Sequence, residues 1–288
     1  VLFRSVVGYG TMKKRDLTGA VSSVKGTDLA VAGVASAAHM LAGKAAGLYV
    51  RQNSAQPGGG LDILIRGAGS VNASNEPLYI VDGFPIAKLD QQKGENGRMD
   101  PGTQGVLNFL NPNDVESIEV LKDASASAIY GARGANGVII IVTKSGKVGK
   151  PKVHYDGSLG WQSVTKKIPM MNAYQFVALQ NEMYPKIVEK SYLSLYDGKQ
   201  WTLDDYKNVP QYDWQDMIFR TAPLQNHNVS LTGGSEEVRY TASLSYFDQD
   251  GIVLKSNYNR LQGRLATTIK YKKWKANFNI NYFSINKS

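Results

Sequence analysis

The chain has 288 residues, enough for a substantial core in one or two domains, and its 33 lysines and arginines outnumber its 24 aspartates and glutamates, a net charge of +9. The absence of cysteine excludes disulfide frameworks, thiolate metal sites and cysteine nucleophiles. The basic residues are mostly scattered and no nucleic-acid motif accompanies them, so we expect no nucleic-acid partner.

The first 26 residues predict an extended polar segment with one strand at Ala20–Val24. With neither an initiator methionine nor a signal peptide at its start, we expect the sequence to be an internal part of a longer protein. The stretch Leu29–Val50 is mostly alanine and glycine, which is too weakly apolar for a transmembrane helix. It predicts a packed helix around Ser36–Lys44 and a strand at Leu48–Arg51.

Short strands are predicted at Asp62–Arg66 and Leu78–Val81, separated by polar loops rich in glycine and asparagine. The segment Lys88–Gly105 shows no apolar periodicity and predicts a long loop. Loops of this length in a compact domain are often functional.

The segment Asn111–Lys144 predicts two strands of different kinds. Ile118 and Val120 alternate with glutamates, which indicates a strand with one face in water. The unbroken apolar run Val138–Val142 indicates a strand buried on both faces.

Between these strands we expect a short helix. Asp123 is a good N-cap, an alanine and serine run reaches Tyr130, and Gly131 can end the helix in a left-handed conformation. The whole segment therefore predicts a small α/β module in which a strand, a helix and a second strand form a crossover.

After Lys147 the apolar period changes to two. In Lys275–Phe283 apolar residues alternate with lysine and asparagine, and the same alternation occurs in Tyr240–Tyr246 and Leu261–Ile269. Gly233–Ser235 predicts a tight hairpin turn. This pattern indicates an antiparallel meander with one lipid face and one aqueous face, as in outer-membrane barrels, and a soluble β-sandwich remains the alternative.

An insertion at Met170–Thr221 interrupts the strands. Asn172 can cap a helix in which Phe176, Leu179 and Met183 share a face. Two loop tryptophans, Trp201 and Trp214, are weak substrate candidates because their rings can stack on sugars, although packing that holds the loop together is the favoured explanation for each of them.

Other motifs do not predict a site. The spacing of Gly131, Gly134 and Gly137 and the run Gly58–Gly60 both lack the Gly-Lys-Ser/Thr ending of a nucleotide loop. Asp248–Gly251 lacks the glutamate of a calcium loop and is better interpreted as a hairpin turn. The three histidines show no zinc spacing and no nucleophile motif is complete, so we expect no metal, no cofactor and no catalytic residue.

Several of these segments together resemble one protein family. They are Val6–Lys25, Leu64–Gly67, Asn75–Gly83, Asn111–Lys144 and Asp213–Pro223. They resemble the plug domain and the early barrel of SusC/RagA-type TonB-dependent outer-membrane transporters. The fold class implied is an α+β plug domain followed by an antiparallel β meander that is the incomplete start of a transmembrane β-barrel.

The resemblance implies three regions. Residues 1–26 are an N-terminal segment near the part that contacts TonB, residues 27–147 are the plug domain, and residues 148–288 are the first barrel strands with a long loop insertion at about 170–221. The candidate TonB contacts are Val6, Val7, Gly8, Tyr9 and Gly10, captured by strand addition; an unstructured terminus is the alternative. Family members usually carry an acidic, valine-rich lead here, and Val1–Ser5 differs from it.

The resemblance also assigns a set of plug-motif residues, whose expected role is to hold the plug together and against the barrel by charge-assisted hydrogen bonds. They are Arg66, Gly67, Pro77, Asp82, Gly83, Asn111, Pro112, Asp114, Lys122, Asp123, Tyr130, Gly131, Arg133, Gly134, Asn136 and Gly137.

The function implied is TonB-dependent import of a large nutrient, most plausibly an oligosaccharide, across the outer membrane, with the plug facing the periplasm and gating the barrel. The implied partners are TonB, a SusD-like surface lipoprotein, the nutrient and outer-membrane lipid. A secreted carbohydrate-binding or adhesive β-rich module is the alternative.

Overall fold

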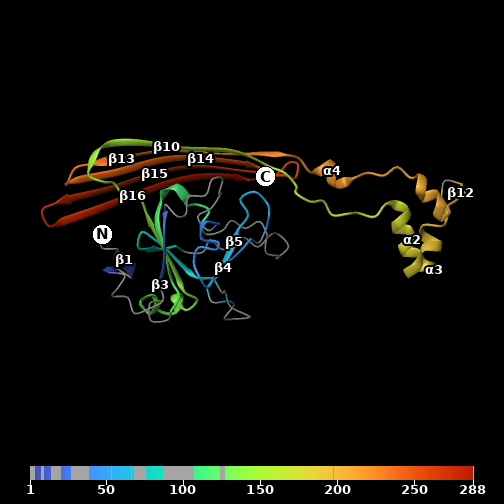
Figure 1. Cartoon of the computed structure of the whole chain (residues 1–288), viewed down its shortest axis with the longest axis horizontal. Coiled ribbons are helices and arrows are strands. Elements are labelled where there is room, and N and C mark those ends of the chain that lie inside the picture. The colour runs from blue at the N-terminus through green and yellow to red at the C-terminus, as the bar shows by residue number, and fades with distance from the viewer. Residues whose placement is uncertain are drawn as a thin grey trace. The chain divides into compact units, whose positions relative to one another are not determined.

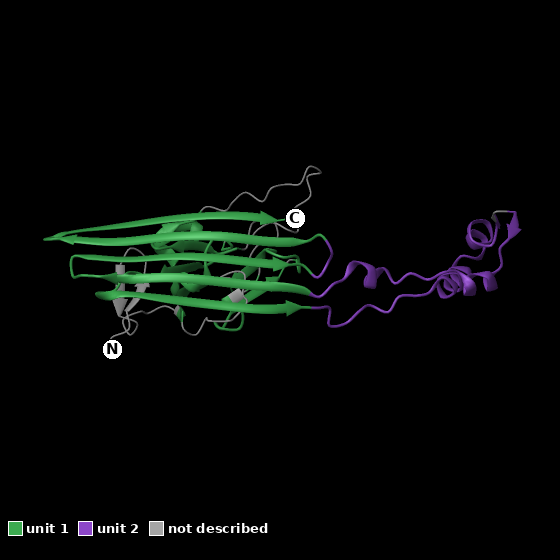
Figure 2. Cartoon of the chain, turned by 90° about the horizontal axis from the view of Figure 1, so that it is seen from above, with its two compact units in different colours: residues 1–162, 222–251, 255–288 green, residues 163–221, 252–254 purple. Residues whose placement is uncertain are grey.

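The computed structural model contains two five-stranded β-sheets that lie one above the other (Figure 1). It describes residues 4–7, 10–13, 21–26, 39–52, 54–65, 67, 76–86, 107–123, 127–196 and 198–287. The chain divides into two compact units, one formed by residues 1–162, 222–251 and 255–288 and the other by residues 163–221 and 252–254 (Figure 2). In the described part of the chain, none of the helices combines the length and the apolar character needed to cross a membrane.

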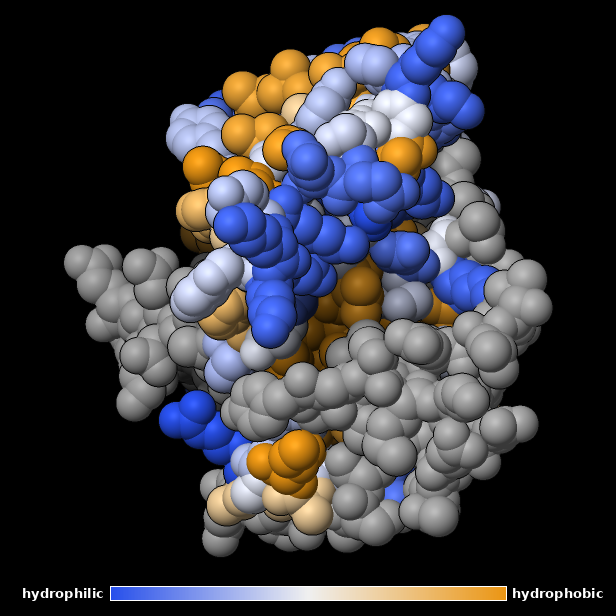
Figure 3. Space-filling view, turned by 90° about the vertical axis from the view of Figure 1, so that its left-hand side faces the viewer, coloured by the Kyte–Doolittle hydropathy of each residue, from blue (hydrophilic) through white to orange (hydrophobic). Residues whose placement is uncertain are grey.

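The upper sheet of the first unit, called the large sheet below, consists of five long antiparallel strands in the order β10-β13-β14-β15-β16. Their bounds are Gly149–Gln162, Ala222–Gly234, Val238–Asp250, Asn257–Tyr271 and Trp274–Lys287. Apart from the insertion between β10 and β13, neighbouring strands follow one another in the chain, which confirms the predicted meander. Figure 3 shows the large sheet from the end that carries the β13–β14 and β15–β16 turns, and its outward face is largely hydrophobic there.

The hairpin between β13 and β14 differs slightly from the prediction. Gly233 and Gly234 still pair with Tyr240 and Arg239 inside the ladder. The chain reverses at Glu236 and Glu237, where Ser235 N donates a hydrogen bond of 2.7 Å to Val238 O. The glycines therefore lie two to three residues before the turn tip.

The lower sheet belongs to the small module, the name used here for the described residues from Val21 to Lys144. Its strand order is β3-β8-β9-β6-β7, and a separate antiparallel ribbon pairs β4 with β5. The strand bounds are Val21–Lys25 (β3), Leu48–Gln52 (β4), Leu61–Ile65 (β5), Leu78–Val81 (β6), Phe84–Pro85 (β7), Val115–Leu121 (β8) and Val138–Thr143 (β9). Three short 3-10 helices complete it: His39–Leu41 (η3), Pro112–Asp114 (η4) and Ala128–Gly134 (η5). An N-terminal hairpin pairs Arg4–Val7 (β1) with Gly10–Lys13 (β2).

The predicted crossover within Asn111–Lys144 is wrong. β8 and β9 lie side by side but antiparallel, with Ile118 opposite Ile141, and the parallel neighbour of β9 is β6. The helix between them is a 3-10 helix broken at Gly131, whose φ of 59° and ψ of −148° reverse the chain instead of carrying it across the sheet. The positive φ at Gly131 agrees with the prediction, although another 3-10 turn follows it.

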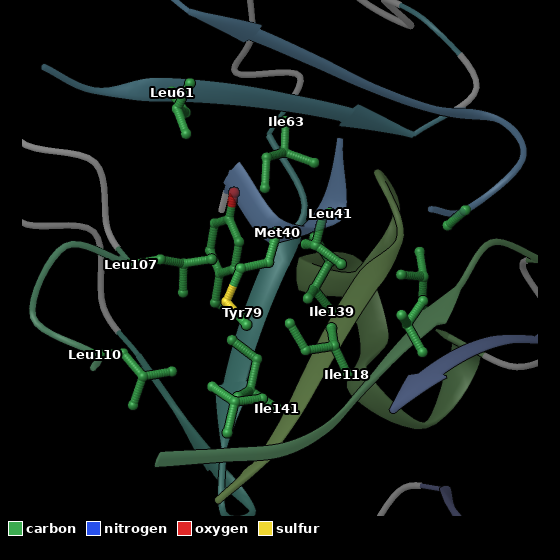
Figure 4. Packing of buried hydrophobic residues seen from close by; sticks show 14 of the residues in the cluster. Met40, Leu41, Leu61, Ile63, Tyr79, Leu107, Leu110, Ile118, Ile139 and Ile141 are labelled. Atoms are coloured by element: carbon green, nitrogen blue, oxygen red, sulfur yellow. The ribbon is translucent and has the colours of Figure 1, made fainter. Parts of the chain in front are cut away.

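The strand β9 is buried on both faces, as its unbroken apolar run predicted. Ile139 and Ile141 point into the larger core cluster, together with Met40, Ile63 and Tyr79 (Figure 4). Val138 and Ile140 point to the opposite side, into a second cluster with Ile80 and Leu121. Each such side chain contributes about 1.5–3 kcal/mol by its burial, so this strand adds substantially to the stability of the small module.

The prediction of a wet face on β8 is wrong at one position. Glu119 is only 2% exposed. Glu119 pairs with Ile140 of β9, so its side chain lies on the face of the sheet that carries the smaller core cluster, and that face is buried.

The second unit holds the insertion. It contains Ala173–Met183 (α2), Pro185–Ser191 (α3), Leu195–Tyr196 (β11), Lys199–Gln200 (β12), Leu203–Asn208 (η6) and Trp214–Ile218 (α4). Asn172 caps α2 in a reciprocal capping box with Gln175, which confirms the predicted cap. Phe176, Leu179 and Met183 all lie in α2 and their side chains are exposed, whereas the buried side chains of α2 and α3 are Val177 and Val188.

Candidate functional site

The large sheet exposes its apolar face and buries its polar face. On the outward face the side chains of Leu244 and Ile280 are 57% and 64% exposed, whereas on the inward face Arg260 is only 1% exposed. The period-two alternation predicted from the sequence is therefore present, with an orientation opposite to that of a soluble sheet. Such a sheet needs an apolar medium outside and a polar partner inside, and the small module is that partner.

Three consecutive inward side chains of β15 donate hydrogen bonds to main-chain carbonyls of the small module. Arg260 Nη1 lies 2.8 Å from Asn108 O, Gln262 Nε2 donates to Phe109 O, and Arg264 Nη1 lies 2.9 Å from Lys144 O. Hydrogen bonds that involve a charged donor are stronger than neutral ones, and here they are screened from water. β15 is thus the strand that fixes the small module most directly.

A second contact centres on the Asp82 carboxylate, in the turn between β6 and β7. Oδ1 accepts from Thr143 N at 2.8 Å, and Oδ2 accepts from Thr143 Oγ1 at 2.6 Å and from Asn279 Nδ2 at 2.8 Å. Arg264 Nη2 lies 3.9 Å from Oδ2 and also donates to Thr143 Oγ1. One carboxylate therefore connects the edge of the small module with β15 and β16.

The local sequence explains why Asp82 can reach the sheet. Asp82 and Gly83 both have positive φ, 50° and 88°, and form the two-residue turn of the β6–β7 hairpin. An Asp-Gly pair is the sequence preferred for a hairpin turn of this kind. The turn places the carboxylate beside the last residue of β9, Thr143.

A third contact involves η4 and the start of β8. Asn111 caps η4 by accepting from Asn113 N, and its Nδ2 donates to Asn228 Oδ1 of β13 at 2.9 Å. Asp114 Oδ2 accepts from Ser243 Oγ of β14 at 2.9 Å. Burial raises the pKa of Asp114 above its ordinary value, while the Ser243 hydrogen bond and the charges of Arg264 and Lys144 act in the opposite direction.

Shape complementarity adds to these polar contacts at Gly58. The Tyr258 ring of β15 is fully buried, and a Cβ on Gly58 would lie 2.1 Å from Tyr258 Cδ2. Gly58 also has a positive φ of 66°. Only glycine allows the ring to approach the backbone this closely.

The structure brings some of the predicted plug-motif residues to the large sheet and leaves others inside the small module. Asp82, Asn111 and Asp114 contact the sheet directly. Lys122 instead donates to Ser22 Oγ at 2.6 Å and to Ala46 O, which connects parts of the small module to each other. Arg133 is exposed and forms no hydrogen bond or ion pair with any described residue, so the geometry gives it no anchoring role there.

The remaining motif residues shape the backbone or the core. Four glycines have positive φ, Gly67, Gly83, Gly131 and Gly137, and Gly134 packs against Ser127 O. Pro112 begins η4, Pro77 is buried, and Tyr130 packs on the smaller core cluster. Asn136 donates a hydrogen bond to Glu76 O, and Asp123 O accepts one from Ser127 N. Arg66 lies outside the described residues.

The candidate TonB contacts are only partly described. Val6 and Val7 lie in β1 and Gly10 in β2, with Val7 opposite Gly10, whereas Gly8 and Tyr9 lie outside the described residues. The described backbone already has the extended conformation that strand addition uses.

The two candidate tryptophans have separate aromatic partners. The Trp201 ring lies 5.1 Å from that of Tyr206, and the Trp214 ring lies 5.9 Å from that of Tyr212. The Trp201 segment is held by the Thr202–Asp205 capping box, and the Lys199 ammonium helps to lower the pKa of Asp205 to about 2. Trp214 is 66% exposed, so it is the better placed of the two to contact a ligand.

The sequence interpretation missed most of the inward partners: Asn108, Thr143, Asn228, Ser243, Arg260, Gln262, Arg264 and Asn279. The signal was present in the strand pattern, because Arg260, Gln262 and Arg264 occupy alternate positions of β15. Large polar side chains in successive inward positions indicate a buried polar contact, and the pattern alone does not identify its partner.

Comparison with known proteins gives consistent matches. A family model described as the TonB-dependent receptor plug domain matches residues 13–138. TonB-dependent receptor SusC of Bacteroides thetaiotaomicron is 39% identical over 96% of this chain and 25% of its own length, and TonB-dependent receptor P26 of Formosa agariphila is 38% identical over 96% and 26%.

A solved structure of the RagAB peptide importer in its open-open state matches with a TM-score of 0.78 and 32% identity, over 99% of this chain and 32% of that one. The chain spans about a quarter of the length of SusC and of P26.

Proposed function

Because this chain belongs to the SusC/RagA family of TonB-dependent receptors, with the small module as its plug domain and the large sheet as the start of its barrel, we propose that the whole protein imports a large nutrient across the outer membrane. The observation that carries the proposal is the inverted large sheet, whose apolar face needs lipid and whose polar face holds the small module. The small module then closes the path through the barrel until it is displaced.

The test is growth of a deletion strain on the nutrient, restored by the full-length gene. We expect restoration to require TonB and the full-length protein to require detergent for extraction, with heat-modifiable migration on gels. A full-length protein that is freely soluble, or uptake that continues unchanged without TonB, would contradict the proposal. Free solubility would instead favour the secreted adhesive module, which the described outward apolar face and the names of the relatives do not support.

We propose the same division of the chain as the sequence suggested: 1–26 near the TonB contact, 27–147 as plug, and 148–288 as barrel strands with an insertion at about 170–221. The change from the mixed sheet of the small module to the antiparallel large sheet supports it. Limited proteolysis of the full-length protein in detergent should cut first in the insertion and near the N-terminal segment, and early cuts within β13–β16 would argue against the division.

TonB is the proposed energy source, acting through Val6, Val7, Gly8, Tyr9 and Gly10. The extended backbone of β1 and β2 supports strand addition at this segment. Calorimetry of the C-terminal domain of TonB with a peptide of residues 1–30 should give binding heat. Heat no greater than dilution would remove these residues from the proposal and leave the import function to other evidence.

For the nutrient we propose an oligosaccharide delivered by a SusD-like surface lipoprotein. The exposed Trp214 ring supports this choice, because sugar rings stack on aromatic faces. A peptide is the second candidate, since one relative is described as a peptide importer. Uptake assays with labelled oligosaccharide and labelled peptide pools distinguish the two, with the W214A and W201A variants reporting whether either ring contributes. Trp201 is held against Tyr206, so we expect the larger loss from W214A.

The proposed activity is transport without catalysis. The named relatives are described as receptors and an importer. Recovery of the nutrient in chemically unaltered form after uptake would agree with this. Hydrolysis by the purified full-length protein would not.

A further inference from the structure

Basic residues gather at the end of the large sheet where its turns are shortest. Along residues 147–152, 234–239 and 270–275 there are eight lysines and arginines against two glutamates. Hydrophilic side chains gather at these strand ends in the end-on view (Figure 3). Most of the net charge of the chain is therefore at one end of the sheet.

The densest part is Lys270–Lys275, called the basic turn below. Lys270 lies directly opposite Lys275, and Tyr271 lies opposite Trp274. Like charges directly opposite one another on paired strands repel and destabilise the sheet. Within the described chain none of the four lysines of the basic turn has an ion-pair partner, whereas Arg239 on the neighbouring hairpin lies 3.3 Å from Glu236. No ion pair among the described residues offsets this repulsion.

The turn residues also adopt an unfavourable backbone. Lys272 and Lys273 form the two-residue loop, and Lys272 has a positive φ of 51°. Glycine or asparagine adopts such a conformation at lower cost. A lysine here carries both a conformational and an electrostatic cost, which an external anion would offset.

The basic turn lies at the boundary of the apolar face. Ile269 and Tyr271 are on the outward face of β15, and Trp274 is opposite Tyr271. The Tyr271 and Trp274 side chains are 66% and 80% exposed, and Lys272 Nζ lies 5.4 Å from the centre of the Tyr271 ring. Tyrosine and tryptophan are enriched where a membrane meets water, and adjacent lysines extend toward the headgroups. The ammonium of Lys272 is therefore at headgroup level if the outward face lies in lipid.

We propose that the basic turn binds the phosphate groups of anionic phospholipids in the leaflet nearest the short turns. This rests on the proposed function, which puts the outward face in a membrane. Three exposed lysines of the second unit, Lys167, Lys199 and Lys207, differ in that each pairs with an aspartate. Lysine near an anionic lipid surface gains about 1 kcal/mol, which corresponds to about a fivefold preference for each residue.

The test uses the full-length protein in nanodiscs made from phosphatidylethanolamine and phosphatidylglycerol. Native mass spectrometry counts the lipids that remain bound to the wild type and to the variants K272Q/K273Q, K272R/K273R and K186Q/K190Q. Lys186 and Lys190 are exposed on α3, so the last variant removes the same charge elsewhere.

We expect the wild type, K272R/K273R and K186Q/K190Q to enrich phosphatidylglycerol and K272Q/K273Q to lose about fivefold or more of that enrichment. Equal enrichment in K272Q/K273Q and wild type would overturn the proposal. So would a loss of enrichment in K272R/K273R, which keeps the charge and would therefore indicate a turn geometry effect.

A soluble anion or an acidic periplasmic protein is the other source of negative charge. If inorganic phosphate or heparin displaces the bound phosphatidylglycerol as effectively as excess anionic vesicles do, the site is a general anion site and the lipid proposal is wrong. Failure here is distinguishable from failure of the import function, because nutrient uptake and the detergent requirement are measured on the same K272Q/K273Q protein and are expected to stay unchanged.

Discussion

Asn279 on β16 donates a hydrogen bond of 2.8 Å from Nδ2 to Oδ2 of Asp82, which lies 197 residues earlier in the chain. The same carboxylate accepts from Thr143 of β9 and lies 3.9 Å from Arg264 of β15. A single turn of the small module thus contacts two neighbouring strands of the large sheet. The four predictions below test which of these contacts hold the small module in place.

The D82N variant removes the carboxylate and keeps a residue that tolerates the positive φ of the turn. Oδ2 accepts from Thr143 and Asn279, and an amide nitrogen at that position cannot. We expect a loss of about 2–3 kcal/mol in the docking of the small module, measured as urea-dependent protection from protease in the full-length protein. D156N is the control, because that carboxylate is exposed and its one ion-pair partner among the described residues is His154. Equal protection of D82N and D156N would refute the assignment.

The R264K variant keeps the charge and loses the planar fork. Arg264 donates to Lys144 O and to Thr143 Oγ1 from two different nitrogens, a geometry that a single ammonium cannot reproduce. We expect R264K to weaken docking by about 1–3 kcal/mol in the same assay. R239K, which changes a more exposed arginine on β14, should have little effect, and an R264K protein as protected as R239K would show that charge alone suffices.

The buried Asp114 makes docking dependent on pH. Its pKa is raised by burial, so the folded state holds the proton to a higher pH than the unfolded state does. Stability therefore falls as the pH rises from about 4 through the folded pKa, and below that range the carboxyl is neutral in both states. D114N stays neutral and still accepts from Ser243.

We expect D114N to unfold at a higher temperature than the wild type at about pH 8, with little difference at about pH 4. The measurement is the melting temperature of the full-length protein in detergent across this range. A D114N protein that melts earlier than the wild type at about pH 8 but not at about pH 4 would mean that the ionised carboxylate stabilises the contact.

A comparison of Gly58 with Gly43 tests whether the space beside a glycine is needed for the packing of Tyr258. Both have positive φ, 66° and 70°, but a Cβ on Gly58 would collide with the Tyr258 ring and a Cβ on Gly43 would contact nothing within 4 Å. We expect G43A to cost about 1 kcal/mol through backbone strain and G58A about 1–3 kcal/mol more through overpacking. Melting temperatures of the two full-length variants make the comparison; equal losses would show that Tyr258 does not need the glycine.

The sequence predicted the elements with strong local patterns and missed those that depend on distant partners. The run Val138–Val142 and the period-two strands β14–β16 were correct because alternation and burial are coupled directly. The antiparallel placement of β8 beside β9 was missed, because it depends on the kink at Gly131, and strand periodicity carries no information on direction. Glu119 was misjudged because its face of β8 carries the smaller core cluster, whose members Ile80, Val138 and Ile140 come from other strands.

The candidate site was predicted in part. Asp82, Asn111 and Asp114 were named from motif resemblance, and the structure puts all three against the large sheet. Their partners Asn228, Ser243 and Asn279 were not named, because small polar residues are ordinary on the aqueous face of any strand. Only the register of β13, β14 and β16 relative to the small module identifies these three.

The inward donors of β15 have a consequence for how such proteins vary. Arg260, Gln262 and Arg264 address carbonyl oxygens of the main chain, at Asn108, Phe109 and Lys144. A peptide oxygen is the same whichever residue carries it, so mutations at those three positions can accumulate without loss of the bonds as long as the main chain keeps its path before η4 and after β9. An insertion or deletion in either segment would move these oxygens away from their donors. We therefore expect the length of both segments to vary far less among related genes than their amino-acid identity does.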